Sequence, residues 1–279
     1  MSYYKNLVKG QYQIGDVVLG KGTNIIVTAF DAKPYDINAQ DYQVSRTDEM
    51  RFGYDSFKPT TIEMQMEVIY NWLIDPYKGT RTNFWHSMPT VNDLAVEWRG
   101  NDVRTSWGAL KPLYYCGRDG IGKVIFGRPG QFSAEKLTAW ATNIKCVGEF
   151  RRSDTFSYSA TEYITSMTSN STITRTQGNT DTWFRVIING PATNPSIQVG
   201  SATFQINTTL ASGKTIEVSS YPWSRRIVNS DGVNLRSSLS GTSPYLDKMI
   251  LPMGISNARI ISGATSAYVA WRDTWSEIE

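Results

Sequence analysis

The segment TIEMQMEVIY, from Thr61 to Tyr70, decides the fold class, because its apolar and polar residues alternate without a break. Successive side chains of a β-strand point to opposite faces, so this period of two is typical of a strand with one buried and one wet face. The predicted buried face carries Ile62, Met64, Met66 and Val68, and the wet face carries Glu63, Gln65 and Glu67. The segment is therefore predicted to be a half-buried strand of a packed sheet.

Hairpin patterns lie on both sides of this strand. Residues 12–30 are predicted to form two strands around the turn Gly20-Lys21-Gly22, since apolar residues alternate before and after it. The runs Leu113 to Cys116 and Lys123 to Phe126 flank the glycine-rich stretch Gly117 to Gly122. Strand, turn and strand are expected there as well.

One helix is predicted after Pro89. Thr90 is a good N-cap, and Asp93 three residues later completes a capping-box-like pair. The apolar face consists of Val91, Leu94, Ala95 and Trp98. Gly100 is predicted to end the helix, because glycine favours the left-handed conformation of a C-cap.

The length of 279 residues favours two domains. From Ser153 to Thr182 the composition shifts toward Ser, Thr and Asn, which is typical of a domain junction or long loops. We place the domains at residues 1–157 and 158–279. Short strands at regular spacing predict a β-sandwich for the second domain, and they are expected at residues 183–189, 196–199, 203–207, 215–219, 259–262 and 267–272. The fold class is therefore mainly β.

Charge and hydropathy argue against several classes of function. The formal net charge is only +3, and Lys and Arg are not gathered into a basic run, so no stable nucleic-acid binding is expected. No segment approaches the ~20 apolar residues of a membrane span, so we expect no membrane insertion. No export signal is recognised, so we expect the protein to be made in the cytoplasm. Cys116 and Cys146 are expected to be buried thiols, although one disulfide remains open.

Catalytic and cofactor motifs are weak. Gly117 to Lys123 matches the start of a phosphate-binding loop, but Val124 stands where a Ser or Thr should be and a strand is expected to follow instead of a helix. His86, the only histidine, is expected to be a packing or surface residue. No catalytic residue, metal site or cofactor is predicted, although a pair of acids for glycoside hydrolysis remains open.

Aromatic residues of the second half suggest sugar stacking as an alternative to ordinary packing. A packing role is least clear for Trp223, because it follows Pro222 and precedes Ser224-Arg225-Arg226 and so does not belong to an alternating strand pattern. Trp223, Arg225 and Arg226 are therefore the candidate carbohydrate-binding residues.

Three short blocks of the first half are Gly108 to Tyr115, Val124 to Phe132 and Gly148 to Tyr158. In wording and order they resemble the first domain of the distal tail proteins of long-tailed phages, especially minor tail proteins of actinobacterial phages. In the second half, similarity to the galectin-like C-terminal domain of that family lies in Gly190 to Pro195, Pro222 to Arg226, Asp231-Gly232, Leu251 to Gly254 and Trp271-Arg272. Residues 31–60 show little similarity.

The resemblance implies a split β-barrel-like N-terminal domain with one helix and a galectin-like C-terminal sandwich. It implies a virion protein of the tail tip, in which six copies form a ring between the tail tube protein and the tail-tip hub around the tape measure protein. The alternatives are a receptor-binding protein that recognises cell-wall carbohydrate and, less favoured, a tail-tip hydrolase.

Overall fold

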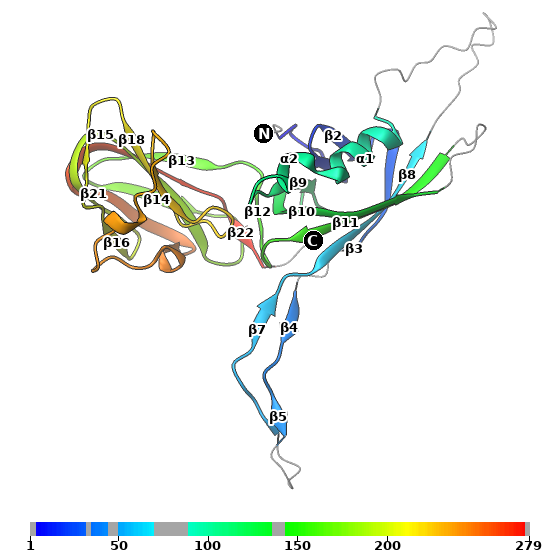
Figure 1. The fold of residues 1–279 in the computed structure, drawn as a ribbon, viewed down its shortest axis with the longest axis horizontal. Coiled ribbons are helices and arrows are strands. Elements are labelled where there is room, and N and C mark those ends of the chain that lie inside the picture. Colours follow the sequence, from blue (N-terminus) through cyan, green and yellow to red (C-terminus); the bar gives the residue numbers. More distant parts are fainter. Residues whose placement is uncertain (1–3, 32–34, 44–49, 70–88, 136–142, 277–279) are drawn as a thin grey trace, which may run out of the picture. The chain divides into compact units, whose positions relative to one another are not determined.

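The computed structural model describes residues 4–31, 35–43, 50–69, 89–135 and 143–276. The chain divides into two compact units, unit 1 (Met1–Ser157) and unit 2 (Tyr158–Ser276). Strands dominate both units (Figure 1), which confirms the predicted mainly β class.

An antiparallel sheet forms unit 1, with its strands joined in the order β2-β1-β9-β10-β11-β8-β3. The bounds of these strands are β1 (Gln11–Ile14), β2 (Val17–Gly20), β3 (Ile25–Asp31), β8 (Thr61–Ile69), β9 (Lys111–Cys116), β10 (Gly122–Ala134) and β11 (Asn143–Arg152). Strand β8 has the predicted alternation, with Ile62, Met64, Met66 and Val68 buried. Each such side chain contributes about 1.5 to 3 kcal/mol through its removal from water.

Helix α1 (Val91–Arg99) packs against this sheet and has the predicted ends. The Thr90 N–H donates to Asp93 Oδ2 at 2.7 Å, and the Asp93 N–H donates to Thr90 Oγ1 at 3.3 Å, so the capping box is complete. Gly100 ends the helix in the left-handed conformation, with φ of 57°. A second short helix, α2 (Asn101–Arg104), then begins, which the sequence did not predict.

Trp98 joins α1 to the sheet. Its indole N–H donates to the Glu149 carbonyl at 2.9 Å, and the ring lies against Gly148. A Cβ at position 148 would collide with this ring, so Gly148 makes the close approach of helix and sheet possible.

The turn of the first predicted hairpin, Gly20-Lys21-Gly22, was placed wrongly. The two-residue loop Gly15-Asp16 joins β1 and β2, with Ile14 opposite Val17. Gly15 has φ of 55°, and a positive φ at the first position of a two-residue loop suits a hairpin. The turn around Lys21 instead sends the chain to β3, which pairs with β8. The second predicted hairpin, β9 with β10, is confirmed.

Between β3 and β8 the chain forms two short two-stranded sheets, which we call the ribbon (residues 35–43 and 50–58). Strand β4 (Asp36–Asn38) pairs with β7 (Ser56–Lys58), and β5 (Tyr42–Gln43) pairs with β6 (Met50–Arg51). In the part of the chain that the structure describes, these strands pair only with each other.

Unit 2 is built on an antiparallel sheet in the order β13-β21-β15-β18-β19. Strand β14 pairs with β21, while β16, β17 and β20 pair with β15. The bounds are β13 (Tyr163–Met167), β14 (Ser171–Arg175), β15 (Thr182–Val199), β16 (Ala202–Gln205), β17 (Thr209–Leu210), β18 (Thr215–Ser219), β19 (Arg226–Asn229), β20 (Ile250–Leu251) and β21 (Gly254–Trp271). Strands β12 (Ser157–Ser159) and β22 (Thr274–Trp275) and the 3₁₀ turns Arg236–Ser238 and Leu246–Lys248 complete the elements.

Two expectations for this half need correction. The region Ser153 to Thr182 is not only loops, because it contains β13 and β14. Its many Ser and Thr residues hide a strand pattern from sequence analysis, in which Met167, Ile173 and Arg175 are the buried positions. The strands expected at residues 183–189 and 196–199 are one strand, β15, and those expected at residues 259–262 and 267–272 are one strand, β21. The pairing of β15 with β21 shifts register in the middle of both strands.

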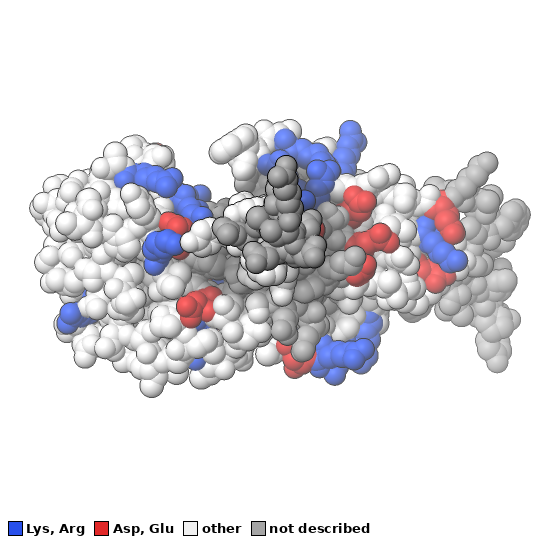
Figure 2. All heavy atoms as spheres, turned by 90° about the horizontal axis from the view of Figure 1, so that it is seen from below, with Lys and Arg blue, Asp and Glu red and all other residues white. Residues whose placement is uncertain are grey.

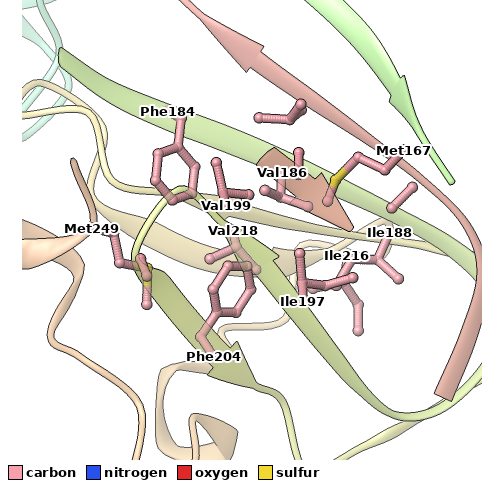
Figure 3. Close-up of a cluster of buried hydrophobic side chains, with 14 of the residues drawn as sticks. Met167, Phe184, Val186, Ile188, Ile197, Val199, Phe204, Ile216, Val218 and Met249 are labelled. Atoms are coloured by element: carbon pink, nitrogen blue, oxygen red, sulfur yellow. The ribbon is translucent and has the colours of Figure 1, made fainter. Parts of the chain in front are cut away.

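The core of unit 2 lies between these strands. Figure 3 shows Phe184, Val186 and Ile188 of β15 directed toward Val218 and Phe204, and all five are buried. At one end, the buried Arg175 guanidinium pairs with Asp273 Oδ1 at 3.0 Å and donates to the Leu251 carbonyl at 2.7 Å.

Candidate functional site

Trp223 belongs to an aromatic cluster of unit 2. Its ring centroid lies 4.5 Å from that of Tyr221 at an interplanar angle of 11°, and 4.3 Å from that of Tyr158 at 67°. Tyr221 is buried, and burial together with the nearby Glu162 carboxylate raises its pKa well above the usual value. Because Tyr221 covers one face of Trp223, that face cannot stack on a sugar.

Arg226 belongs to a chain of ion pairs. Its Nε lies 2.9 Å from Glu217 Oε1, and Glu217 Oε2 lies 3.3 Å from Arg185 Nη1. Arg185 Nη2 lies 2.5 Å from Glu162 Oε2, and the Tyr221 hydroxyl donates to Glu162 at 3.0 Å. The guanidinium of Arg226 thus already has a carboxylate partner.

Arg225 is exposed, so the three predicted residues have three different environments. Tyr221, two residues before Trp223, could have been added from sequence spacing. Tyr158 and Glu162 could not, because only the folded chain brings them there. Sugar recognition by Trp223, Arg225 and Arg226 stays a prediction, which a glycan array on the full chain and on Trp223→Ala would test.

The stretch from Gly117 to Lys123 is the turn of the β9–β10 hairpin and not a loop before a helix. The Lys123 ammonium lies 2.7 Å from Asp119 Oδ2, and this ion pair lowers the pKa of Asp119 although partial burial opposes the shift. The lysine that would contact phosphate in a phosphate-binding loop is therefore buried against its own turn.

The chemistry of the remaining candidates is limited. His86 lies outside the described residues. Within those residues, no group of three or more His, Cys, Asp or Glu side chains could hold a metal ion. Cys116 and Cys146 are buried and not joined to each other, as expected. None of the helices in the described ranges is long and apolar enough to cross a membrane.

The ribbon is the most unusual surface of the described chain. Its large apolar side chains are all exposed, by fractions that range from 42% to 94%. They are Tyr35, Ile37, Tyr42, Met50, Phe52, Tyr54 and Phe57. Large apolar side chains that are all exposed within one segment are typical of a surface that contacts another molecule.

The β4–β7 part of the ribbon has one apolar and one polar face. Ile37 lies opposite Phe57, and Tyr35 contacts Phe57 edge-on with ring centroids 4.6 Å apart. The other face carries the pair Asp36 and Lys58 and the pair Asn38 and Ser56. This is the pattern of strands with one covered face, yet no described part of the chain covers it.

Charged residues of both signs are visible on the face that Figure 2 shows. Basic residues gather in two places near its upper edge, and acidic residues lie beside them and farther along the face among uncharged ones. This agrees with the small net charge of +3.

The fold was compared with those of known proteins. No family model and no curated protein matches the chain. Among solved structures it is similar to the SPP1 Dit protein, described as a paradigm of the hub adsorption apparatus in phages that infect Gram-positive bacteria. The TM-score is 0.55 at 12% identity, over 90% of this chain and 93% of the SPP1 protein.

A chain of the phage P2 baseplate in its activated conformation with calcium is also similar. Here the TM-score is 0.54 at 9% identity, over 94% of this chain and 97% of the baseplate chain. The same baseplate with strontium gives a TM-score of 0.51 at 11% identity, over 94% and 98%. The resemblance that the sequence suggested is thereby confirmed in the fold: over nearly its full length, the chain has the fold of phage Dit and baseplate hub proteins.

Proposed function

We propose that this chain is a structural protein of a phage tail tip, which forms a hexameric ring at the distal end of the tail. The ring would join the tail tube protein to the tail-tip hub and enclose the tape measure protein. The observation that carries the proposal is the near full-length similarity to Dit and baseplate chains. The exposed ribbon supports it, because an assembling subunit needs apolar surface that it does not cover itself.

Ring assembly imposes a condition on the subunit surface. Identical subunits close a ring through heterologous contacts, in which one patch meets a different patch of the next copy. The ribbon is a suitable first patch. The small net charge suits a ring around a channel through which DNA must pass without tight binding.

Unit 2 is proposed to be the galectin-like domain, which serves as a docking module. Its broad sheet and well-filled core suit a rigid support. Its aromatic cluster and ion pairs are largely occupied with one another, so structural support is favoured over sugar recognition.

The test is the mass of the full chain in solution, by light scattering and native mass spectrometry, followed by negative-stain imaging. We expect six-copy particles with a central hole. Phe57→Asp should reduce their amount, because it places a charge on the apolar face of the ribbon. Tyr245→Asp is the control, since Tyr245 is 76% exposed in unit 2 and outside the ribbon. A strict monomer at every concentration would contradict self-assembly.

A further inference from the structure

Strand β13 lies at one edge of the sheet of unit 2 and has a partner strand on one side only. It pairs with β21, with Tyr163 opposite Trp271 and Met167 opposite Ala267. Among the described residues, no strand pairs with its other side. An edge strand leaves a row of backbone N–H and C=O groups that can bind a further strand. The outer side of β13 is therefore a place where an extended segment can be added.

Two other outer strands of this unit, β16 and β19, are covered by the chain itself. At β19, the Leu235 N–H donates to the Ile227 carbonyl at 2.8 Å. At β16, the Ser240 N–H donates to the Gln205 carbonyl at 2.9 Å. The chain thus continues past these two strands and binds their outer backbone groups, which it does not do at β13.

The sequence of β13 lacks the features that usually protect an open edge. Such edges commonly carry lysine, proline or a bulge, whereas β13 reads Tyr-Ile-Thr-Ser-Met and pairs with β21 without a register shift. Tyr, Ile and Thr favour extended strands. Ile164 is 61% exposed, so an added strand would bury apolar surface there. Strand β14 continues along the same side of β21, but its exposed residues are only Thr172 and Thr174.

Both ends of β13 are held in place before any partner binds. The Tyr163 ring stacks on the Trp271 ring, with centroids 5.7 Å apart and an interplanar angle of 25°. One residue earlier, the Glu162 carboxylate belongs to the chain of ion pairs described above. At the far end, the Ser171 hydroxyl donates to the Ser166 carbonyl at 3.1 Å. Because β13 is already extended, little conformational freedom is lost when another strand pairs with it.

We infer that the outer side of β13 receives one extended strand from a different protein of the tail tip. This inference rests on the proposed docking role of unit 2 and names its contact surface. The added strand should be uncharged and about five residues long, because β13 has five residues and none of them is charged. It should carry a β-branched or aromatic residue opposite Ile164, since such cross-strand pairs stabilise a sheet.

The β13 strand of a second copy is not the expected occupant. Two identical strands that pair antiparallel are related by a two-fold axis, whereas neighbours in a closed ring of six are related by a six-fold rotation. The proposed ring therefore leaves the β13 edge of every copy available to another protein. In strand addition of this kind, main-chain hydrogen bonds supply the affinity and alternate side chains supply the specificity.

The test is amide hydrogen exchange of the full chain with a synthetic peptide of the sequence Ala267 to Trp271. In the fold this segment of β21 pairs antiparallel with β13, so the peptide presents a matching alternation of side chains to the open side. Alternate amides of Tyr163 to Met167 should exchange at least about fivefold more slowly at ~1 mM peptide. The peptide with Tyr268→Pro and Val269→Pro lacks a ladder N–H in either orientation and should protect nothing.

A variant of the full chain locates the binding edge. Ile164→Lys should abolish the protection, because lysine on an edge strand opposes strand addition. Ile255→Lys is the matched control, since Ile255 is 75% exposed and lies on β21 opposite Thr174 of β14, away from β13. Both side chains are exposed, so neither substitution should alter unfolding of the chain.

No protection of β13 by the peptide, or equal protection in Ile164→Lys, would overturn the inference. A dimer of the unmodified chain that Ile164→Lys dissociates would also overturn it, because β13 would then pair with a second copy. Six-copy rings should form as well in Ile164→Lys as in the unmodified chain, and their loss would assign the edge to the ring contact instead. If the unmodified chain forms no rings but the peptide still protects β13, the result would support the edge and count against the ring.

Discussion

Strand β8 and the ribbon are neighbours in the chain and alternate in the same way, but they differ in what covers them. Met64 of β8 is fully buried, whereas Phe57 of the ribbon is 66% exposed. Both positions belong to an apolar face with a polar face behind it. Alternation in a sequence thus tells us that a face must be covered, but not whether the same chain or another molecule covers it.

The largest expected difference in the free energy of unfolding is between variants of two tryptophans, one covered by its own chain and one exposed. Trp98→Ala should lower the free energy of unfolding by about 3 to 5 kcal/mol, because it empties a packed site between α1 and the sheet. Trp107→Ala should change it by less than about 0.5 kcal/mol, since the side chain is fully exposed. Chemical denaturation of both variants under dissociating conditions measures this. Equal effects would show that Trp107 is covered by its own chain.

A second pair tests the two strands directly. Met64→Ala should lower the free energy of unfolding by about 2 to 5 kcal/mol, because contacts are lost and a cavity remains. Phe57→Ala should cost less than about 0.5 kcal/mol in the monomer and should reduce assembly instead. Denaturation and solution mass separate the two effects. A large loss of monomer stability from Phe57→Ala would break the comparison.

The capping box of α1 gives a smaller effect. Thr90→Ala should lower the free energy of unfolding by about 1 kcal/mol, because the Asp93 N–H loses its hydrogen-bond acceptor. Asn92→Ala, on the exposed side of the same turn, is the control and should be close to neutral. Thermal unfolding would measure both, and an equal response would rule out a stabilising cap.

The last prediction concerns the thiols, whose effect appears only at high pH. Burial raises the pKa of Cys146 to about 11. Because the folded state holds this proton more tightly than the unfolded state, its contribution to stability is lost as pH rises from about 9 to about 11. At pH 8 the native chain should resist alkylation at Cys146 until denaturant is added. Rapid alkylation of the native chain would show that β11 opens readily.

Much of unit 1 could be predicted from sequence, because its signals are local. The alternation of β8, the capping box at Thr90 and the glycines of the β9–β10 turn each lie within a few residues. The first hairpin was misplaced because two glycine turns compete, one at Gly15 and one at Gly20 to Gly22. Only the pairing of β3 with β8, far along the chain, decides between them.

The surfaces were less predictable. Residues 31–60 show little similarity to the family, and the exposure of the ribbon appears only when the rest of the fold leaves its apolar side chains uncovered. The surroundings of Trp223 depend on Tyr158 and Glu162, which lie at distant positions in the sequence. Local patterns do not carry such long-range contacts.

Hydrogen exchange of the backbone amides in residues 35–43 and 50–58 tests the central claim most directly, when monomeric and assembled fractions of the full chain are compared. We predict fast exchange in the monomer, where the two-stranded ribbon is marginally stable on its own, and clear protection in the assembled form. Equally fast exchange in both fractions would contradict the claim that another copy covers the ribbon.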